Sequence, residues 1–184
     1  SKISVASAAP AFGFNKTKLH SMASQLNVEA SPHLMFHHLK QPVGSTQDEA
    51  RRLLRERHAD EAGKCLAVLA DQQNQGRGTQ GRKWESVPGR AGNMYLTVCL
   101  PMDQIPVTLT LLPLQVGVLA ARYVSRLLEA CHVSNNPSNN KVPATVKWPN
   151  DVLIDEKKVS GTLIESEVID GTSWLLVGIG VNVA

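Results

Sequence analysis

The chain has few of the features that mark secreted or membrane proteins. Among its 184 residues there are only three cysteines, an odd number, and no two of them lie close in sequence. This spacing argues against a disulfide framework and against a CxxC metal site. No apolar stretch is long enough to cross a bilayer, because the longest, around residues 105–121, is interrupted by threonine, proline and glycine. We therefore expect a cytoplasmic protein with no membrane partner.

The signatures of several other functional classes are also missing. A net charge of +3 is too small to indicate a nucleic-acid partner by itself. There is no Walker A loop, no Rossmann fingerprint and no Gly-x-Ser-x-Gly nucleophile motif. The six histidines have no zinc-like spacing. What is present is a globular composition, 42% hydrophobic and 19% charged, in a chain long enough for one hydrophobic core.

The hydrophobic pattern predicts one α+β domain over residues 33–184, preceded by a mobile leader. The leader is residues 1–32, which are rich in Ser and Ala and weakly periodic. Apolar runs and alternation predict strands near residues 33–40, 65–71, 93–100, 146–148, 152–154, 159–167 and 174–183. Apolar residues at helical spacing predict helices over 47–58 and 108–130. The expected fold is a mixed, largely antiparallel sheet packed with these helices.

A polar, glycine-rich loop over residues 72–84, QQNQGRGTQGRKW, is the first candidate site. Its three glycines let the backbone bend sharply and approach a ligand closely, and its amide groups can form an anion-binding concavity. Arg77 and Arg82 suit phosphate because a guanidinium group can make two parallel charge-assisted bonds. The loop therefore indicates a phosphate or carboxylate site, although composition alone fits a flexible basic surface loop about equally well.

Two segments in the second half of the chain place polar side chains beside strands. In KWPND, Pro149 creates a bend that presents Asn150 and Asp151, although an ordinary proline turn has the same pattern. In KVSGTLIE, which begins at Lys158, alternation indicates that one face lines something buried. Gly161 on that face leaves room for a ligand against the strand.

Two shorter segments are further candidates for the site. GSTQDEA contains Ser45 and Thr46, which suit the N-cap of the helix that follows. In VGIGVNV, Gly178 and Gly180 lie two residues apart, so they share a face of the strand with Asn182 and leave space above it. Alone, this segment is a buried strand with two glycines.

Taken together, these segments resemble the biotin–protein ligases. GRGTQGRKW is similar to the family's Gly-Arg-Gly-x-x-Gly-Arg-x-Trp loop, and KWPND matches Lys-Trp-Pro-Asn-Asp nearly letter for letter. The segments at Ser45, Lys158 and Gly178 resemble three further family motifs, and all occur in family order from about residue 36 to 183. Thr79 departs from the bacterial pattern, which has a second arginine there that helps to retain the adenylate.

The resemblance implies a role for each matching residue. Biotin contacts are implied for Ser45, Thr46, Gln73, Gly76, Arg77, Lys158, Gly161 and Leu163. Nucleotide contacts are implied for Arg82, Trp84, Asn150 and Asn182. The catalytic group is Arg77, Arg82, Lys158 and Asp151, with Asp151 also as a magnesium ligand.

The implied activity is the ATP-dependent attachment of biotin to a lysine of a biotin carboxyl carrier protein, through biotinyl-AMP and with Mg²⁺. The alternatives are a lipoate–protein ligase of the same fold and a non-catalytic biotin-binding fragment. A biotin-responsive repressor is disfavoured, since the leader looks too short for a helix-turn-helix domain. Family members continue beyond the last motif into a small C-terminal β-barrel, so we expect the catalytic domain to be incomplete here. A homodimer is a further expectation.

Overall fold

The computed structural model of the protein describes residues 33–85, 93–105, 108–132 and 143–182. The predicted leader, residues 1–32, lies outside the described residues. No helix in the described ranges combines the length and apolar character that crossing a bilayer demands.

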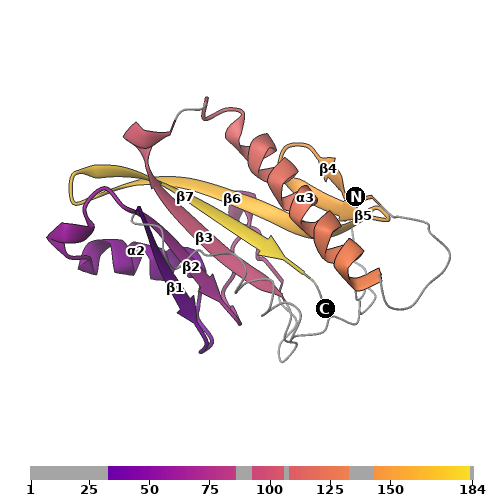
Figure 1. The fold of residues 1–184 in the computed structure, drawn as a ribbon, viewed down its shortest axis with the longest axis horizontal. Coiled ribbons are helices and arrows are strands. Elements are labelled where there is room, and N and C mark those ends of the chain that lie inside the picture. The colour runs from indigo at the N-terminus through magenta and orange to yellow at the C-terminus, as the bar shows by residue number, and fades with distance from the viewer. Residues whose placement is uncertain (1–32, 86–92, 106–107, 133–142, 183–184) are drawn as a thin grey trace.

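Seven strands form one sheet in the order β1-β2-β3-β7-β6-β5-β4 (Figure 1). The strands are β1 (Leu34–Leu39), β2 (Cys65–Ala70), β3 (Met94–Pro101), β4 (Thr145–Lys147), β5 (Asp151–Ile154), β6 (Lys157–Ile169) and β7 (Thr172–Val181). β1 and β2 run parallel, and every other neighbouring pair is antiparallel. The prediction of a mixed, largely antiparallel sheet is therefore confirmed.

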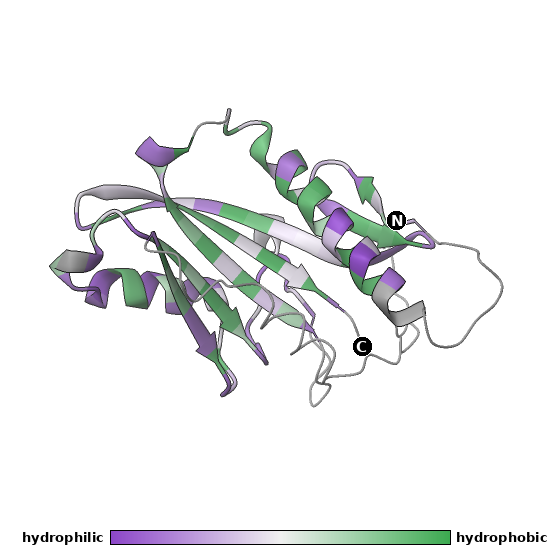
Figure 2. Cartoon of the chain, viewed as in Figure 1, coloured by the Kyte–Doolittle hydropathy of each residue, from purple (hydrophilic) through white to green (hydrophobic). Residues whose placement is uncertain are grey.

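Two α-helices, α2 (Thr46–Glu56) and α3 (Leu112–His132), pack on opposite faces of this sheet. Ala50 and Leu54 of α2 pack with Trp174 and Leu176 of β7. The intervening residues of β7, such as Leu175, point the other way and pack against α3. In Figure 2 the central strands β3 and β7 are coloured mainly green with pale residues between, as expected for strands covered on both faces.

Several element boundaries differ from the prediction, most of them by one or two residues. The helix predicted from residue 108 begins at Leu112, with Pro113 in its first turn, where a missing amide hydrogen costs nothing. β6 extends beyond its predicted bounds at both ends, and β7 begins two residues earlier than predicted. The two strands are joined by a tight turn at Asp170-Gly171, where φ is 49° and 77°. Both positions lie in the left-handed region that two-residue hairpin turns require. The long hairpin brings Gly161 opposite Gly180, which places both beside the pocket described next.

Candidate functional site

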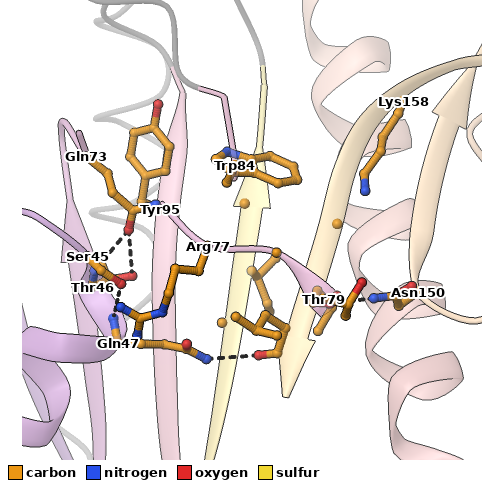
Figure 3. A pocket seen from close by; sticks show the side chains of 17 residues that line it. Ser45, Thr46, Gln47, Gln73, Arg77, Thr79, Trp84, Tyr95, Asn150 and Lys158 are labelled. Carbon is orange, nitrogen blue, oxygen red and sulfur yellow. Dashed lines mark hydrogen bonds between the residues drawn. The ribbon is translucent and has the colours of Figure 1, made fainter. Parts of the chain in front are cut away.

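A small pocket lies on the α2 face, between the start of α2, the glycine-rich loop and the β6–β7 hairpin (Figure 3). Its volume is about 50 Å³. The predicted ligand contacts that line it are Ser45, Thr46, Gln73, Arg77, Trp84, Asn150, Lys158, Gly161 and Leu163. Segments that are far apart in sequence therefore meet here.

The wall of the pocket at the start of α2 consists of neutral polar groups that bond one another. Ser45 is the N-cap of α2, and its Oγ accepts a hydrogen bond from the Gln47 amide at 3.2 Å. Gln73 Oε1 accepts from Thr46 N at 2.9 Å and from Thr46 Oγ1 at 3.3 Å. Thr97 Oγ1 donates to Thr46 Oγ1 at 2.9 Å. These side chains are held in fixed orientations, which suits a neutral polar ligand whose groups need buried partners.

The glycine-rich loop folds as a short hairpin over residues 76–84, which we call the tongue. Gly78 N donates to Arg82 O at 2.7 Å, and Trp84 N donates to Gly76 O at 2.9 Å. Its tip is a single turn, Thr79–Gly81, in which Gln80 and Gly81 have φ of 59° and 71°. The predicted loop is thus ordered by its own backbone bonds, and its tip carries Thr79 into the pocket wall.

The two arginines of the tongue have different partners. Arg77 lines the pocket and donates two hydrogen bonds to Asp48, at 2.6 and 2.7 Å. This pairing lowers the pKa of Asp48 and raises the pKa of Arg77. Arg82 turns back onto the tip of the tongue, where it donates to Thr79 Oγ1 at 2.7 Å and to Thr79 O at 3.1 Å. Arg82 is not among the residues that line the pocket.

Trp84 covers the glycines of the hairpin. A Cβ added at Gly180 would lie 2.7 Å from the Trp84 ring, and one added at Gly161 would lie 2.9 Å from it. Gly178 faces Gln47 in the same way, with Nε2 at 2.9 Å from such a Cβ. The space above the glycines, predicted to receive a ligand, is therefore filled here by side chains of the chain itself.

The far wall of the pocket carries the second cation. Lys158 Nζ lies 2.7 Å from Asp151 Oδ1 and 5.4 Å from the centre of the Trp84 ring. Asn150 follows a cis Trp148–Pro149 peptide bond and donates from Nδ2 to the Thr162 carbonyl. KWPND and the start of β6 thus lie together, as their motifs predicted.

The residues that line the pocket differ in part from the predicted ligand contacts. Gly76, Arg82, Asp151 and Asn182 were predicted as contacts but do not line the pocket, so their ligand roles stay predictions. Asn182 Oδ1 is buried and has no hydrogen-bond partner among the described residues. Several lining residues were not predicted, namely Gln47, Tyr95, Thr162 and Ile179. The first of these directly follows Ser45-Thr46, which is a signal that could have identified it.

A metal site is not evident from the side chains alone. Within the described ranges, no group of three or more His, Cys, Asp or Glu side chains is placed to hold an ion. Asp151 contributes one carboxylate, and Lys158 is already paired with it. One carboxylate is sufficient for Mg²⁺ only when water and the phosphates of a nucleotide supply the other oxygen ligands.

The fold and the pocket together define an α+β domain with a small pocket that is lined by two cationic side chains, Arg77 and Lys158. Residues 43–182 match the model of the biotin/lipoate A/B protein ligase family. This match spans most of the chain, and the chain therefore belongs to that family.

Individual relatives agree with this assignment. A biotin–[acetyl-CoA-carboxylase] ligase of Paracoccus denitrificans is 37% identical over 64% of this chain and 44% of its own length. The Leishmania major biotin protein ligase in complex with biotinyl-5-AMP is 37% identical, with a TM-score of 0.59, over 83% of this chain and 58% of that one. The Aquifex aeolicus enzyme in complex with biotin and ATP is 34% identical, with a TM-score of 0.55, over 83% and 53%. The chain thus spans about half the length of these relatives.

Proposed function

We propose that this chain activates biotin with ATP and transfers it to a lysine of a biotin carboxyl carrier domain. The observation that carries the proposal is the pocket, in which neutral hydrogen-bonding groups at the start of α2 lie beside one cation, Arg77, while a second cation, Lys158, lines the far wall. The neutral wall suits the ureido ring of biotin, and the cations suit its carboxylate and the phosphate that joins it. Relatives of 37% and 34% identity, in complex with biotinyl-5-AMP and with biotin and ATP, support the same ligands.

The chemistry needs no nucleophile from the protein. The biotin carboxylate attacks the α-phosphorus of ATP, pyrophosphate leaves, and the neutral amine of the carrier lysine then displaces AMP. Two anions must approach each other in the first step, so fixed positive charge at the point of contact lowers the barrier. Arg77 and Lys158 are the cations that line the pocket. Magnesium bound with the nucleotide would add further neutralising charge, and we propose Asp151 as its protein ligand.

The pocket must widen to admit biotin. Its present volume of about 50 Å³ is well below the roughly 300 Å³ at which small-molecule sites begin. Trp84 occupies the space above Gly161 and Gly180, and within the described part of the chain the backbone hydrogen bonds of the tongue run between its own residues. We therefore propose that the Trp84 ring moves and that the tongue then closes over the ligand, excluding water from the mixed anhydride.

The acceptor and the compartment are also proposals. The Paracoccus relative is named for acetyl-CoA carboxylase, and a carboxylase carrier domain is the acceptor that we propose. A reducing cytoplasm suits Cys65 and Cys99, which are free thiols. Burial raises the pKa of Cys99 to about 12, which keeps it protonated and unreactive near neutral pH. A homodimer stays a prediction.

The test is to mix the purified protein with biotin and MgATP, and to measure pyrophosphate release and the biotinyl-AMP that remains bound. Biotin-dependent pyrophosphate supports the proposal, and retained adenylate shows that Thr79 is sufficient where an arginine is usual. Pyrophosphate with lipoate but not with biotin would move the activity to the lipoate ligases. Biotin binding without pyrophosphate would leave a biotin-binding fragment.

A further inference from the structure

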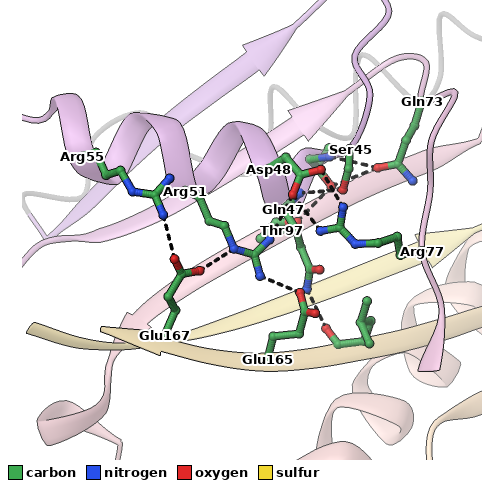
Figure 4. A network of polar contacts seen from close by, with 12 residues as sticks. Ser45, Gln47, Asp48, Arg51, Arg55, Gln73, Arg77, Thr97, Glu165 and Glu167 are labelled. Carbon is green, nitrogen blue, oxygen red and sulfur yellow. Dashed lines mark hydrogen bonds and ion pairs between the residues drawn. The ribbon is translucent and has the colours of Figure 1, made fainter. Parts of the chain in front are cut away.

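Asp48 lies at the edge of the pocket, in the first turn of α2. Its two carboxylate oxygens accept separate hydrogen bonds from the two terminal nitrogens of Arg77, at 2.6 and 2.7 Å (Figure 4). Two parallel bonds fix the plane of a guanidinium group as well as its position. Arg77 still has three N–H groups for other partners, because a guanidinium has five. The pairing therefore orients Arg77 without using all of its donors.

Asp48 is itself anchored to the sheet. Arg51 Nη1 donates to Asp48 Oδ1 at 3.2 Å, and Arg51 Nη2 donates to Glu165 at 2.7 Å. Arg51 Nε donates to Glu167, and the Arg51 side chain is only 17% exposed. A continuous line of ion pairs thus runs from the tongue through α2 to β6.

An ion pair with the exposure of Asp48 and Arg77 adds little to folding stability. Their side chains are 52% and 40% exposed, and solvent screens such pairs. The bidentate geometry and the connection to the half-buried Arg51 are what distinguish this pair from an ordinary surface contact. Its effect should therefore appear mainly in the placement of Arg77 and of the tongue, and only slightly in the melting temperature.

We propose that Asp48 is a positioning residue, which holds the Arg77 guanidinium against the pocket and ties the tongue to α2. An incoming carboxylate or phosphate then meets a cation that is already oriented. The identity of that anion rests on the proposed function, whereas the tie between tongue and helix does not. A role as a simple counter-charge predicts the opposite result, because removing Asp48 would then free Arg77 to bind anions more tightly.

The experiment compares Asp48→Asn with Glu49→Gln. Glu49 is in the same first turn of α2 but pairs with Arg52 and does not line the pocket, so both changes remove one negative charge from the same helix end. Trypsin cleavage after Arg77, Arg82 and Lys83, without ligand, measures the freedom of the tongue. Calorimetry with biotin measures the dissociation constant. For Asp48→Asn we expect cleavage about tenfold faster and biotin binding about tenfold weaker, with neither changed in Glu49→Gln.

A second variant tests the route through Arg77. Lysine at that position keeps the charge but cannot form two parallel bonds. We expect Arg77→Lys to free the tongue as Asp48→Asn does, and the double variant to be no worse than either single one. Additive effects would overturn the proposal, since Asp48 would then act elsewhere.

Three further outcomes bear on the proposed role of Asp48. Tighter biotin binding in Asp48→Asn would make Asp48 a competitor of the ligand, and unchanged cleavage would remove the tie; either result overturns the proposal. If the unmodified protein binds no biotin, the proposed function fails, while the cleavage comparison still judges the role of Asp48.

Discussion

Two sets of polar side chains line the pocket, a neutral wall and a charged wall, and they differ in how their side chains are held. On the α2 side, Thr46, Gln73 and Thr97 are neutral, and their hydrogen bonds to one another are already made. The charged wall consists of two cations, Arg77 on the tongue beside α2 and Lys158 on β6 across the pocket, and each is held by a carboxylate of the chain, Asp48 or Asp151. The neutral groups are held in place by one another, whereas an anion at the pocket would have to share or displace the carboxylates that hold the cations.

This difference indicates that the neutral groups and the cations affect different kinetic constants. A neutral group that keeps its orientation contributes similarly before and during a reaction, so it affects mainly binding. A cation whose partner can change is able to interact more strongly as negative charge gathers at the reacting phosphate, so it affects mainly rate. Mutations on the two walls should therefore separate KM from kcat.

The largest effect is expected on the charged wall. Lys158→Ala removes a pocket cation and leaves Asp151 without the partner that lies 2.7 Å away. We expect biotin-dependent pyrophosphate release to fall by about 100-fold or more, mostly in kcat. The control is Lys157→Ala, an adjacent exposed lysine that does not line the pocket. Equal losses in the two variants would show that the general positive charge of this hairpin matters, and not the position of Lys158.

A smaller effect, of a different kind, is expected on the neutral wall. Thr46→Val keeps the shape of the side chain but removes the hydroxyl that bonds Gln73 and Thr97, leaving Thr97 Oγ1 without its acceptor. We expect KM for biotin to rise about tenfold with kcat little changed, and the free energy of unfolding to fall by about 1–3 kcal/mol. Steady-state kinetics and urea denaturation measure the two, with Thr145→Val on the exposed strand β4 as the control. A fall in kcat at constant KM would remove the distinction between the walls.

The sequence predicted the neutral wall better than the charged one. Ser45 and Thr46 could be assigned as a helix cap from their local pattern, and the structure confirms that Ser45 is the N-cap. The partner of Arg77 could not be assigned, because Asp48 lies 29 positions away and looked only like an acidic residue in a first helical turn. Which carboxylate meets which cation depends on the packing of α2 against the hairpin, and no short-range pattern encodes it.

Contacts between distant segments were also not predictable at Gly161, Gly178 and Gly180. The spacing of the two glycines in β7 predicted an open face, and that face is indeed turned toward the pocket. That Trp84 would fill it depended on how the tongue folds back over the strand pair Gly161–Gly180. Alternation predicts which face a residue occupies, but it does not predict which side chain from another segment covers that face.

The smallest expected effect concerns pH and again separates the two walls. The hydrogen bond from Arg77 holds the pKa of Asp48 below its ordinary value of 3.8. The carboxylate therefore stabilises the folded state fully above that ordinary value, and the contribution is lost as the pH falls through the lower folded pKa. We expect the melting temperature of Asp48→Asn to lie slightly below that of the unmodified protein near pH 7 and to converge with it as the pH falls below the lowered pKa of Asp48, as scanning calorimetry would measure. Thr46, Gln73 and Thr97 do not titrate, so the deficit of Thr46→Val should stay constant over the same range. A deficit that shrank in step with that of Asp48→Asn would mean that the two walls do not act independently.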